Sequence, residues 1–518
     1  MKNDIPTLLA VSRRKFLASA GAALASSAIP CSLTAAQQPA KYHRVNLMDP
    51  NAPLASYGKA IAAMLKLPPS DPRNWYRNAF IHTMDCPHGN WWFLPWHRGY
   101  LGWFEQTCRE LSGDPNFAFP YWDWTTLPQI PAQFFDGVLN PENDAYIASL
   151  AEFEQQLRNP LSDLWKSFNP AQLQQLQDRG FNSIDDVWQV VEQSPMFFPR
   201  GQARALTQGS PGFDTLTRKA VSLKTLLAAL SPTDFMGFNS PVAQQHSDIV
   251  GASILEGQPH NHVHNNIGGF MQDNLSPVDP LFFMHHSNID RIWDVWTRKQ
   301  QQANLPIVPT DPTELANWNK ESFLFYINSQ GQPVSKNTSG DYIAIGEFDY
   351  DYQPGSGDKP PVKPSPFANK LWAGTLAAKQ LNFRHSSHAM VMVPEAMAES
   401  AAQPEGQTLF AMVTLKAGMD MSDVQFDVLV NPPENAEQVH LDDPSFAGSF
   451  SMFGMRSGKH GGKPFTFSVP ISDAVAKLKA TKQFDPAVPL RVQVVASRKG
   501  IALMPLDIQV ADISVGAF

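Results

Sequence analysis

The 518-residue chain has few cysteines and no long hydrophobic run. Three cysteines exclude a disulfide framework, and without a C-x-x-C pair the chain lacks the usual zinc and thioredoxin-like motifs. No apolar run reaches the length of a membrane span. A long basic run is also missing and the formal net charge is −8, so nucleic acid is not an expected partner. The length predicts two or three domains.

The N-terminal segment, residues 12–30, reads SRRKFLASAGAALASSAIP. Two adjacent arginines precede a weakly hydrophobic, Ala-rich stretch, which is typical of a bacterial twin-arginine export signal. Small residues allow cleavage after Ala28 or Ala36, and the alternative is an amphipathic N-terminal helix. We therefore expect residues 1–36 to direct export to the periplasm or the exterior. Such substrates cross already folded, often with a metal loaded, which is a first hint of a cofactor.

The rest of the chain divides into a helical part and a β-rich part. Apolar residues at helical spacing predict a helix over 53–67, an Asp-Pro start predicts another over 71–84, and 131–230 has a helical pattern. The Pro- and Gly-rich stretch 353–366 indicates a linker. Beyond it, short β-rich runs alternate with turn residues, which favours a sandwich or barrel. The expected units are the signal (1–36), a mainly helical catalytic domain (37–355), a linker (356–366) and an all-β domain (367–518).

Histidines are concentrated in two short blocks. Eight of the 14 fall within 82–97 and 260–286. His260 and His264 are four residues apart, which places them on one face of a helix where both can reach one ion. His286 lies in the segment HHSNIDRIW, another helix-like stretch. Buried core histidines are the alternative, but clustering of this degree favours a metal site.

The residue types around the histidines narrow the choice of metal. A zinc protease motif needs Glu directly after the first histidine, where this chain has Asn261. A di-iron carboxylate bundle needs several Glu-x-x-His motifs, and these are absent. Two groups of three neutral imidazoles with few carboxylates suit copper best. Two copper ions facing each other could hold O2 between them, a redox task that zinc cannot perform.

Longer motifs resemble the two copper signatures of the tyrosinase family, the type-3 copper polyphenol oxidases. These are FLPWHRGYLGWFE at 93–105 and SPVDPLFFMHHSNIDRIW at 276–293. FDYDY at 348–352 resembles the Tyr-x-Tyr signature that closes the catalytic domain, and Arg44 stands where its N-terminal partner is expected. The resemblance spans roughly residues 40–355. It implies a mainly α catalytic domain whose four-helix bundle core holds two copper ions, followed by a C-terminal β extension.

The resemblance implies six histidine ligands. They are His82, His88 and His97 for the first copper, and His260, His264 and His286 for the second. His82 lies only six residues before His88, closer than in many family members, and His43 is the upstream alternative. Cys86 matches the Cys-x-His arrangement that in some members forms a thioether to the histidine ring; a free thiol is the alternative. His285 is expected to pack behind its ligand neighbour.

Four further residues receive roles from the same resemblance. Asp290 is expected to accept a hydrogen bond from a ligand or its helix and to orient it. Phe282 is expected to cover the copper pair as an aromatic gate, although an ordinary core position explains it equally. Asn261 and Glu256 match an Asn and a Glu that together hold a water for the deprotonation of monophenols; a helix-start carboxylate is the alternative for Glu256. His262 is expected to be a bystander on the opposite helix face.

The implied reaction is the oxidation of a small phenolic substrate by O2. A tyrosinase hydroxylates a monophenol ortho to its OH and oxidises the diphenol to an o-quinone, and this is our expectation. The alternatives are a catechol or o-aminophenol oxidase, a hemocyanin-like O2-binding protein, and a binding module with core histidines. The Gly-rich loop 448–464, with Phe453 and Met455, is predicted to plug the substrate cavity as part of a C-terminal lid. A hairpin tip that does not touch the site is the alternative.

Overall fold

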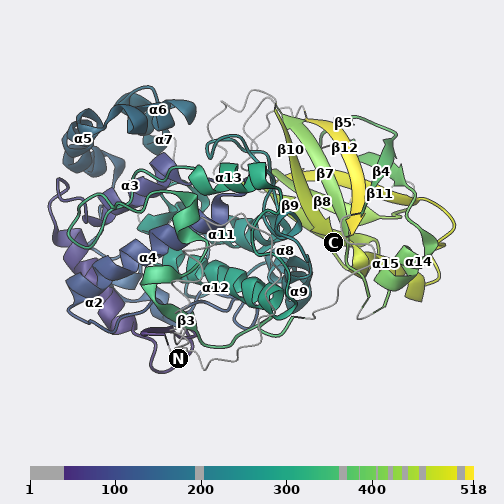
Figure 1. Ribbon diagram of the computed structural model, residues 1–518, viewed down its shortest axis with the longest axis horizontal. Helices are drawn as coiled ribbons and strands as arrows, with labels where there is room; N and C mark the ends of the chain where they lie inside the picture. Colours follow the sequence, from purple (N-terminus) through teal and green to yellow (C-terminus); the bar gives the residue numbers. More distant parts are fainter. Residues whose placement is uncertain are drawn as a thin grey trace, which may run out of the picture.

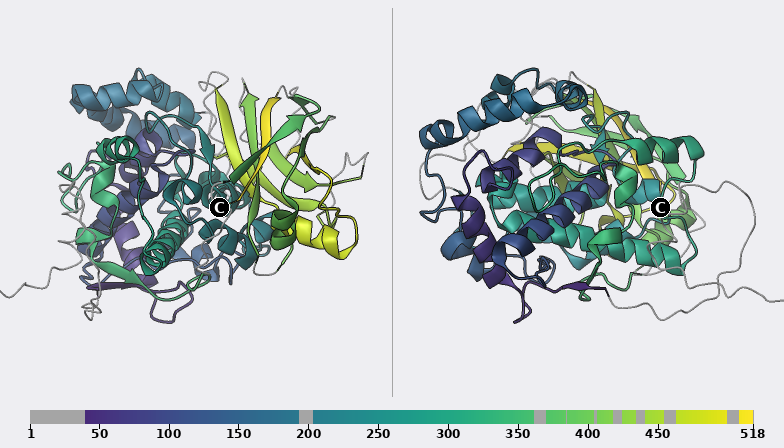
Figure 2. Two further views of the ribbon diagram at one scale, coloured as in Figure 1. Left: turned by 45° about the vertical axis from the view of Figure 1, so that its right-hand side comes forward. Right: turned by 60° about the vertical axis from the view of Figure 1, so that its left-hand side comes forward.

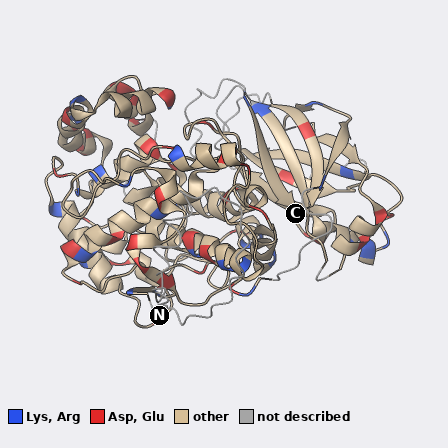
Figure 3. Cartoon of the chain, in the orientation of Figure 1, with Lys and Arg blue, Asp and Glu red and all other residues tan. Residues whose placement is uncertain are grey.

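The structure is a computed structural model. It describes residues 40–192, 203–360, 370–383, 385–403, 406–417, 424–433, 441–453, 463–498 and 508–517. The predicted export signal and Met455 lie outside the described residues. Figure 1 shows a helical domain on one side and a strongly curved sheet on the other. Both signs of charge are interspersed over the helical domain (Figure 3), in keeping with the mild net charge of the chain.

The helical domain contains the elements that the apolar spacing predicts. In chain order its helices are α2 (Leu54–Lys66), α3 (Trp75–Asp85), α4 (Phe93–Ser112), α5 (Leu150–Ser167), α6 (Pro170–Asp178), α7 (Ile184–Glu192), α8 (Thr215–Ala220), α9 (Leu223–Leu230), α10 (Phe235–Phe238), α11 (Asn261–Ile267), α12 (Leu281–Gln302) and α13 (Pro312–Lys320). None of the helices in the described part of the chain is long and apolar enough to cross a membrane. Helices α3, α4, α11 and α12 form the core of the domain, and α12 is buried along most of its length.

The start of α3 differs from the prediction. The helix begins at Trp75 rather than at Asp71, because the side chain of Asn74 accepts hydrogen bonds from the backbone N–H groups of Tyr76 and Arg77 and caps it. The side chain of Asp71 instead accepts from the backbone and guanidinium of Arg73 in the preceding turn. The capping residue therefore decides where this helix begins.

The two ends of the helical domain are joined by a pair of short parallel strands. β1 (Tyr42–Arg44) pairs with β3 (Tyr350–Tyr352), so that Arg44 lies opposite Tyr352. The Arg44 guanidinium stacks 3.5 Å from the centroid of the Tyr350 ring and donates to the Tyr352 hydroxyl at 2.7 Å. The predicted partnership of Arg44 with the Tyr-x-Tyr segment is confirmed. It closes the domain around α4 and α12.

The C-terminal domain is a ten-stranded sheet with two short helices. Its elements are β4 (Lys370–Leu376), β5 (Gln380–Leu381), β6 (Ser387–Val391), α14 (Glu395–Ala401), β7 (Leu409–Ala417), β8 (Val424–Val430), β9 (Phe446–Ser451), β10 (Pro464–Pro470), α15 (Ser472–Ala480), β11 (Leu490–Arg498) and β12 (Ile508–Ala517). With β2 (Gly251–Ala252) as its tenth strand, the order is β2-β10-β7-β12-β4-β6-β11-β8-β9, and β5 pairs with β12. Figure 2 shows how the strands curl. The rings of Phe450 on β9 and Phe467 on β10 stack at 4.5 Å, so the two ends of the sheet share one core.

One strand of this sheet belongs to the helical part of the chain. β2 (Gly251–Ala252) pairs in parallel with β10, and Gly251 lies opposite Thr466. A Cβ atom on Gly251 would lie 2.0 Å from the Thr466 carbonyl oxygen, so this close pairing requires glycine. The two domains are therefore joined by a shared sheet as well as by the linker.

Candidate metal centre

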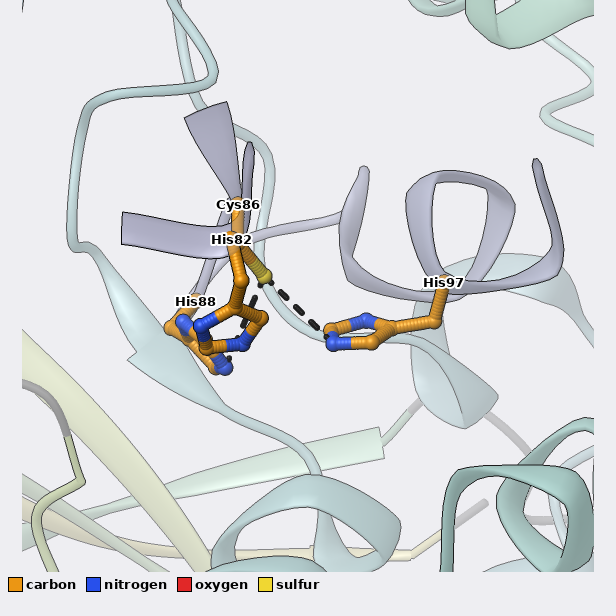
Figure 4. A group of neighbouring side chains, drawn as sticks. All are labelled: His82, Cys86, His88 and His97. Carbon is orange, nitrogen blue, oxygen red and sulfur yellow. Dashed lines mark hydrogen bonds between the residues drawn. The ribbon is translucent and has the colours of Figure 1, made fainter. Parts of the chain in front are cut away.

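The first histidine cluster lies where α3 and α4 approach each other. His82 is on α3, His97 is on the first turns of α4, and Cys86 and His88 lie in the loop between the helices. Each of the four side chains offers one ligand atom, and these atoms all lie within 4.8 Å of one another. The Cys86 Sγ atom lies 3.7 Å from His88 Nε2 and 3.4 Å from His97 Nε2 (Figure 4). The structure thus brings all three predicted first-site histidines together with the cysteine.

The second cluster joins α11 to the start of α12. His260 ends a π-helical turn (Glu256–His260) that runs into α11, which carries His264. These two meet His285 and His286 of α12, again with ligand atoms within 4.8 Å of one another. The Nε2 atoms of His264 and His286 are 3.2 Å apart. His285 does not only pack behind its neighbour, because its ring belongs to the same cluster as the predicted ligands.

The two clusters face each other across a short gap. The rings of His97 and His286 stack with their centroids 4.1 Å apart and their planes 7° from parallel. The rings of His88 and His260 stack at 5.6 Å. The arrangement therefore offers two adjacent sets of nitrogen atoms, one from each cluster. His43, the alternative ligand, lies elsewhere and contacts Asp351 on β3.

Four of the rings are oriented by an oxygen acceptor on Nδ1. His82 Nδ1 lies 2.7 Å from the Asn274 carbonyl, and His97 Nδ1 lies 2.8 Å from the Phe93 carbonyl. In the second cluster, His264 Nδ1 meets the Met271 carbonyl at 2.5 Å and His260 Nδ1 meets the Asn261 Oδ1 at 2.8 Å. Because an oxygen of this kind only accepts, Nδ1 carries the proton and Nε2 keeps its lone pair. This outer support is typical of metal-binding histidines.

The rings have the protonation state that a metal needs. Burial lowers the pKa of His82 and of His260 to about 3, and it places the pKa of His88, His97, His264, His285 and His286 well below the ordinary value. Among the described residues, Nε2 of His82 and of His260 has no hydrogen-bond partner. Such buried atoms are costly unless something binds them. Two sets of neutral imidazoles with a nearby thiol and few carboxylates therefore fit a pair of copper ions.

Two phenylalanines lie against the histidine clusters. The Phe282 ring, on α12, lies 4.1 Å from the His286 ring and 5.2 Å from the His82 ring, so it touches both clusters. Phe453, just after β9 of the C-terminal domain, lies 4.2 Å from the His264 ring and 4.9 Å from the His88 ring. Both predicted aromatic residues are therefore beside the site, from opposite domains.

Glu256 and Asn261 both have protein partners. The carboxylate of Glu256 accepts from the backbone N–H of Gly89 at 2.6 Å and from the Ser240 hydroxyl. Burial raises the pKa of Glu256 to about 8, against the lowering effect of these two hydrogen bonds. Asn261 binds His260 through its oxygen, and its amide donates to the Ser451 carbonyl at 2.9 Å. Glu256 thus links the second-site helix to the residue after His88, and Asn261 links it to the C-terminal domain.

Asp290 contacts no ligand ring among the described residues, and its partners fit the other expectation, that it orients its helix. Its carboxylate accepts from Arg98 at 2.7 Å and from the hydroxyls of Tyr350 and Tyr352 at 2.5 and 2.6 Å, and no ligand ring is among these partners. Asp290 lies one turn beyond His286 on α12, and there β1, β3 and α4 bring cationic and phenolic donors to it. Burial raises the pKa of Asp290, but Arg98 and Arg44 outweigh it and hold the pKa below the ordinary value. Asp290 orients α12 as a whole.

His262 also has a partner that the sequence did not indicate. Its Nε2 atom lies 3.0 Å from the Ser449 carbonyl on β9, and Asn265 on the same helix donates to the Met452 carbonyl at 3.0 Å. Helix α11 therefore presents one face to the metal site and another to the C-terminal domain. No local sequence signal marks this contact, because the partners are nearly two hundred residues apart.

Comparison with known proteins finds a match for each of the two parts of the chain. Residues 72–299 match the common central domain of tyrosinase, and residues 371–516 match a domain of unknown function, DUF7868. The chain is 26% identical over 442 residues to (+)-larreatricin hydroxylase of Larrea tridentata, covering 78% of this chain and 66% of that protein. It is 22% identical over 498 residues to the tyrosinase HcTyr1 of a Hahella strain, covering 86% and 93%.

Solved structures show the same fold. A latent aurone synthase (polyphenol oxidase) superimposes with a TM-score of 0.58 at 20% identity, covering 93% of this chain and 89% of that one. The chain spans a smaller share of two plant relatives: 66% of the length of the Larrea tridentata hydroxylase and 65% of the length of a polyphenol oxidase of Malus domestica. The predicted arrangement of a helical core followed by a β domain is confirmed.

Proposed function

Because the chain belongs to the type-3 copper tyrosinase and polyphenol oxidase family, we propose that it hydroxylates monophenols at the ortho position and oxidises o-diphenols to o-quinones with O2. The observation that carries this proposal is the pair of facing histidine clusters, joined by the stacked rings of His97 and His286. In the balanced reactions, one monophenol and one O2 give one o-quinone and one water, and two diphenols and one O2 give two o-quinones and two waters.

We propose that His82, His88 and His97 hold one copper ion and that His260, His264 and His286 hold the other. When bound, the copper pair supplies the electron transfer between the phenol and O2. The protein keeps the imidazoles neutral by burial and fixes four of them through Nδ1. We also propose that Cys86 forms a thioether to a ring carbon of His88, with the thiol hydrogen and the ring hydrogen passing to O2 as the oxidant. The sulfur lies 3.7 Å from His88 Nε2 and 3.4 Å from His97 Nε2, and the Cys-x-His spacing favours His88.

Monophenols need a proton acceptor because the phenol must lose its proton before it reacts. We propose that Asn261 and Glu256 hold the water that accepts this proton. Glu256 is buried one helical turn before His260, and its pKa of about 8 lets it exchange a proton near neutral pH. Asn261 is already fixed beside the ligand by its bond to His260.

The C-terminal domain is proposed to act as a lid over the site, with Phe453 as the plug. Phe453 is buried, and its ring contacts histidines of both clusters. The lid is attached through α11, where Asn261, His262 and Asn265 bind the strand β9 and the residue after it. Since a phenol must approach the same histidines, the docked domain excludes it.

Export through the twin-arginine route is a further proposal, which Arg13 and Arg14 support.

The activity proposal is tested by comparing rates on tyrosine, catechol and o-aminophenol with copper-loaded protein. Oxidation of all three, with a lag on tyrosine, supports a tyrosinase. Oxidation of catechol or o-aminophenol alone assigns the diphenol or aminophenol oxidase instead. Stoichiometric O2 binding without turnover contradicts both. The variants E256Q and N261A are expected to lower the rate on tyrosine by roughly 10²-fold relative to the rate on catechol.

The lid is tested in the full chain with F453A, which removes the ring and leaves the domain attached. The rate on catechol is expected to rise because the phenol can then approach the histidines. The matched control F383A removes an exposed phenylalanine of the same domain and is expected to leave the rate unchanged. Equal rates for wild type and F453A would refute the plug.

Export is tested with the variant R13K/R14K in a bacterial host, which should leave the protein in the cytoplasmic fraction.

A further inference from the structure

A buried histidine outside both clusters lies behind the loop of the first metal site. His246 is in the segment that leads to β2, and only 2% of its side chain is exposed. Its Nε2 atom lies 3.1 Å from a carboxylate oxygen of Asp85, and its Nδ1 atom lies 2.6 Å from a carboxylate oxygen of Glu321. The ring therefore bridges two carboxylates from distant parts of the chain.

Asp85 connects this ring to the first cluster. It is the last residue of α3, the helix that carries His82, and it directly precedes Cys86. Its second carboxylate oxygen accepts the indole N–H of Trp96 at 2.8 Å, and Trp96 is the neighbour of His97 on α4. A single carboxylate thus contacts both helices of the first cluster, and His246 holds it from behind.

The backbone around His246 holds the other end of the same loop. The side-chain amide of Asn90 donates to the carbonyls of His246 at 3.0 Å and Asp248 at 2.8 Å. The carbonyl of Gly89 accepts from the N–H groups of Val250 and Gly251. The loop 85–90 is therefore attached to the segment 246–251 at its start, through Asp85, and at its end, through Gly89 and Asn90.

The charges around His246 favour an imidazolium. Burial alone lowers the pKa of His246, but the hydrogen bonds to Asp85 and Glu321 outweigh it and raise the pKa above its ordinary value. A protonated ring donates from both nitrogens, whereas a neutral ring would turn a lone pair toward one carboxylate. Arg179 of α6 also lies on this side and donates to the Cys86 carbonyl at 2.8 Å. The side-chain amide nitrogen of Gln175, on the same helix, donates to the Ser322 carbonyl and lies 3.1 Å from Nδ1, so it is a donor beside this ring nitrogen and not an acceptor for it.

His88 needs such support more than the other predicted ligands of its cluster. His82 and His97 lie on helices and are fixed by carbonyl groups, but His88 lies in the loop and is partly exposed. Among the described residues, the ring of His88 makes a hydrogen-bond contact with the Cys86 sulfur at 3.7 Å. The position of His88 therefore depends on how firmly the loop is held.

We propose that His246 is a positioning residue for the first metal site: its ring, bound between Asp85 and Glu321, fixes the loop that presents Cys86 and His88 to His82 and His97. This inference rests on the proposed copper site, but not on phenol oxidation. Loss of the bridge loosens the first cluster and leaves the second cluster, on α11 and α12, unaffected.

The test compares H246Q with H43Q, which removes an exposed histidine that also binds a carboxylate. Copper-loaded protein is mixed with an excess of a copper chelator at pH 7, and the copper that stays bound is followed with time. In H246Q one copper ion is expected to leave about 10- to 100-fold faster than in wild type, because outer-shell partners contribute that much to metal affinity. The second ion should leave at the wild-type rate, and H43Q should match wild type.

A second readout separates positioning by charge from simple packing. The metal-free proteins are melted between pH 5 and 9. A raised pKa in the folded state contributes stability that is complete below the unfolded value near 6.5 and is lost as pH rises through the folded value. The melting difference between wild type and H246Q should therefore be largest at low pH and shrink as pH rises. E321Q, at a partly exposed position, should move this decrease to lower pH while the protein stays folded.

The outcomes distinguish the inference from the function. Faster loss of both copper ions, or a melting difference that does not vary with pH in both H246Q and E321Q, overturns the role of His246. If H246Q does not fold, the copper release and the melting of E321Q decide the matter alone. Copper and melting results as expected in a protein that oxidises no phenol would keep the positioning role and reject the proposed activity.

Discussion

The two histidine clusters use the same residue type but are held in different ways. In the second cluster every histidine lies on a helix, and α12 is buried along most of its length. In the first cluster His82 and His97 lie on helices, while Cys86 and His88 lie in the loop between them. Helix packing fixes the geometry of the second cluster, whereas the geometry of the first cluster depends on hydrogen bonds that hold a loop.

This difference explains where the buried polar groups of the domain gather. Asp290 ties α12 to α4, β1 and β3 through Arg98, Arg44 and two tyrosines. The loop of the first cluster is held instead by hydrogen bonds to Glu256, Arg179 and the His246 segment. The second cluster should therefore tolerate loss of a neighbouring hydrogen bond better than the first. The predictions below test that contrast, beginning with the largest effect.

Removing one ligand from each cluster should abolish phenol oxidation but affect copper content separately. H88Q and H286Q are each expected to retain about one copper ion per chain, because each leaves the other cluster complete. H286Q should also lower the melting temperature, since it leaves an uncompensated polar group in a buried helix. Metal analysis and catechol oxidation measure both effects. H385Q, an exposed histidine of the C-terminal domain, serves as the control, and loss of both ions in H286Q alone would reverse the contrast.

Breaking the Asp290 network should destabilise the protein without removing copper from one cluster selectively. D290N leaves Arg44 and Arg98 buried without their full counter-charge, which costs about 3–5 kcal/mol. The melting temperature is the measurement. D351N removes a carboxylate of β3 that is 49% exposed and should cost close to nothing. Equal melting temperatures for the two variants would show that α12 is held by packing alone.

The stability that Glu256 contributes, at the hydrogen bond that links the two clusters, should depend on pH. The pKa of Glu256 is raised from 4.5 to about 8 in the folded protein, so its contribution to stability is complete below about pH 4.5 and is lost as pH rises toward 8. E256Q keeps an acceptor for Gly89 and removes this loss, so the metal-free variant should gain on the order of 4 kcal/mol over wild type between pH 4.5 and 8. Melting curves at both pH values measure the gain. A difference that is constant with pH would contradict the raised pKa.

The smallest effect is expected at Cys86. A bond to the His88 ring would make the tryptic peptide 78–98 lighter by two hydrogen atoms and unreactive toward thiol reagents, which mass spectrometry detects. C86S should release the first copper about 10-fold faster and leave the second unchanged. C108S, at the other free buried cysteine among the described residues, is the matched control. A peptide of full mass with a reactive thiol would show that the bond does not form.

Much of the metal centre could be predicted from the sequence because its signals are local. The spacing of His260 and His264 on one helix, and of His88 and His97 across a helix start, already places the rings near one another. The structure places His82 on α3 beside His88 and His97 and places His43 elsewhere, which supports the choice of His82 over His43. The Tyr-x-Tyr segment and Arg44 likewise meet as predicted.

The sequence does not predict hydrogen-bond and strand partners that belong to distant segments of the chain. The orientation of Asp290 depends on β1 and β3, which lie at the two ends of the helical domain. His246 gave no sequence signal, because Asp85 lies 161 residues before it and Glu321 lies 75 residues after it. The pairing of β2 with β10 joins segments more than two hundred residues apart. Periodicity carries no information about such pairs.

The most direct test of the central claim is anomalous diffraction at the copper absorption edge from crystals of the copper-loaded protein. Two peaks are expected, one among the side chains of His82, His88 and His97 and one among those of His260, His264 and His286. A single peak, or peaks away from these histidines, would contradict the assignment of a two-copper site.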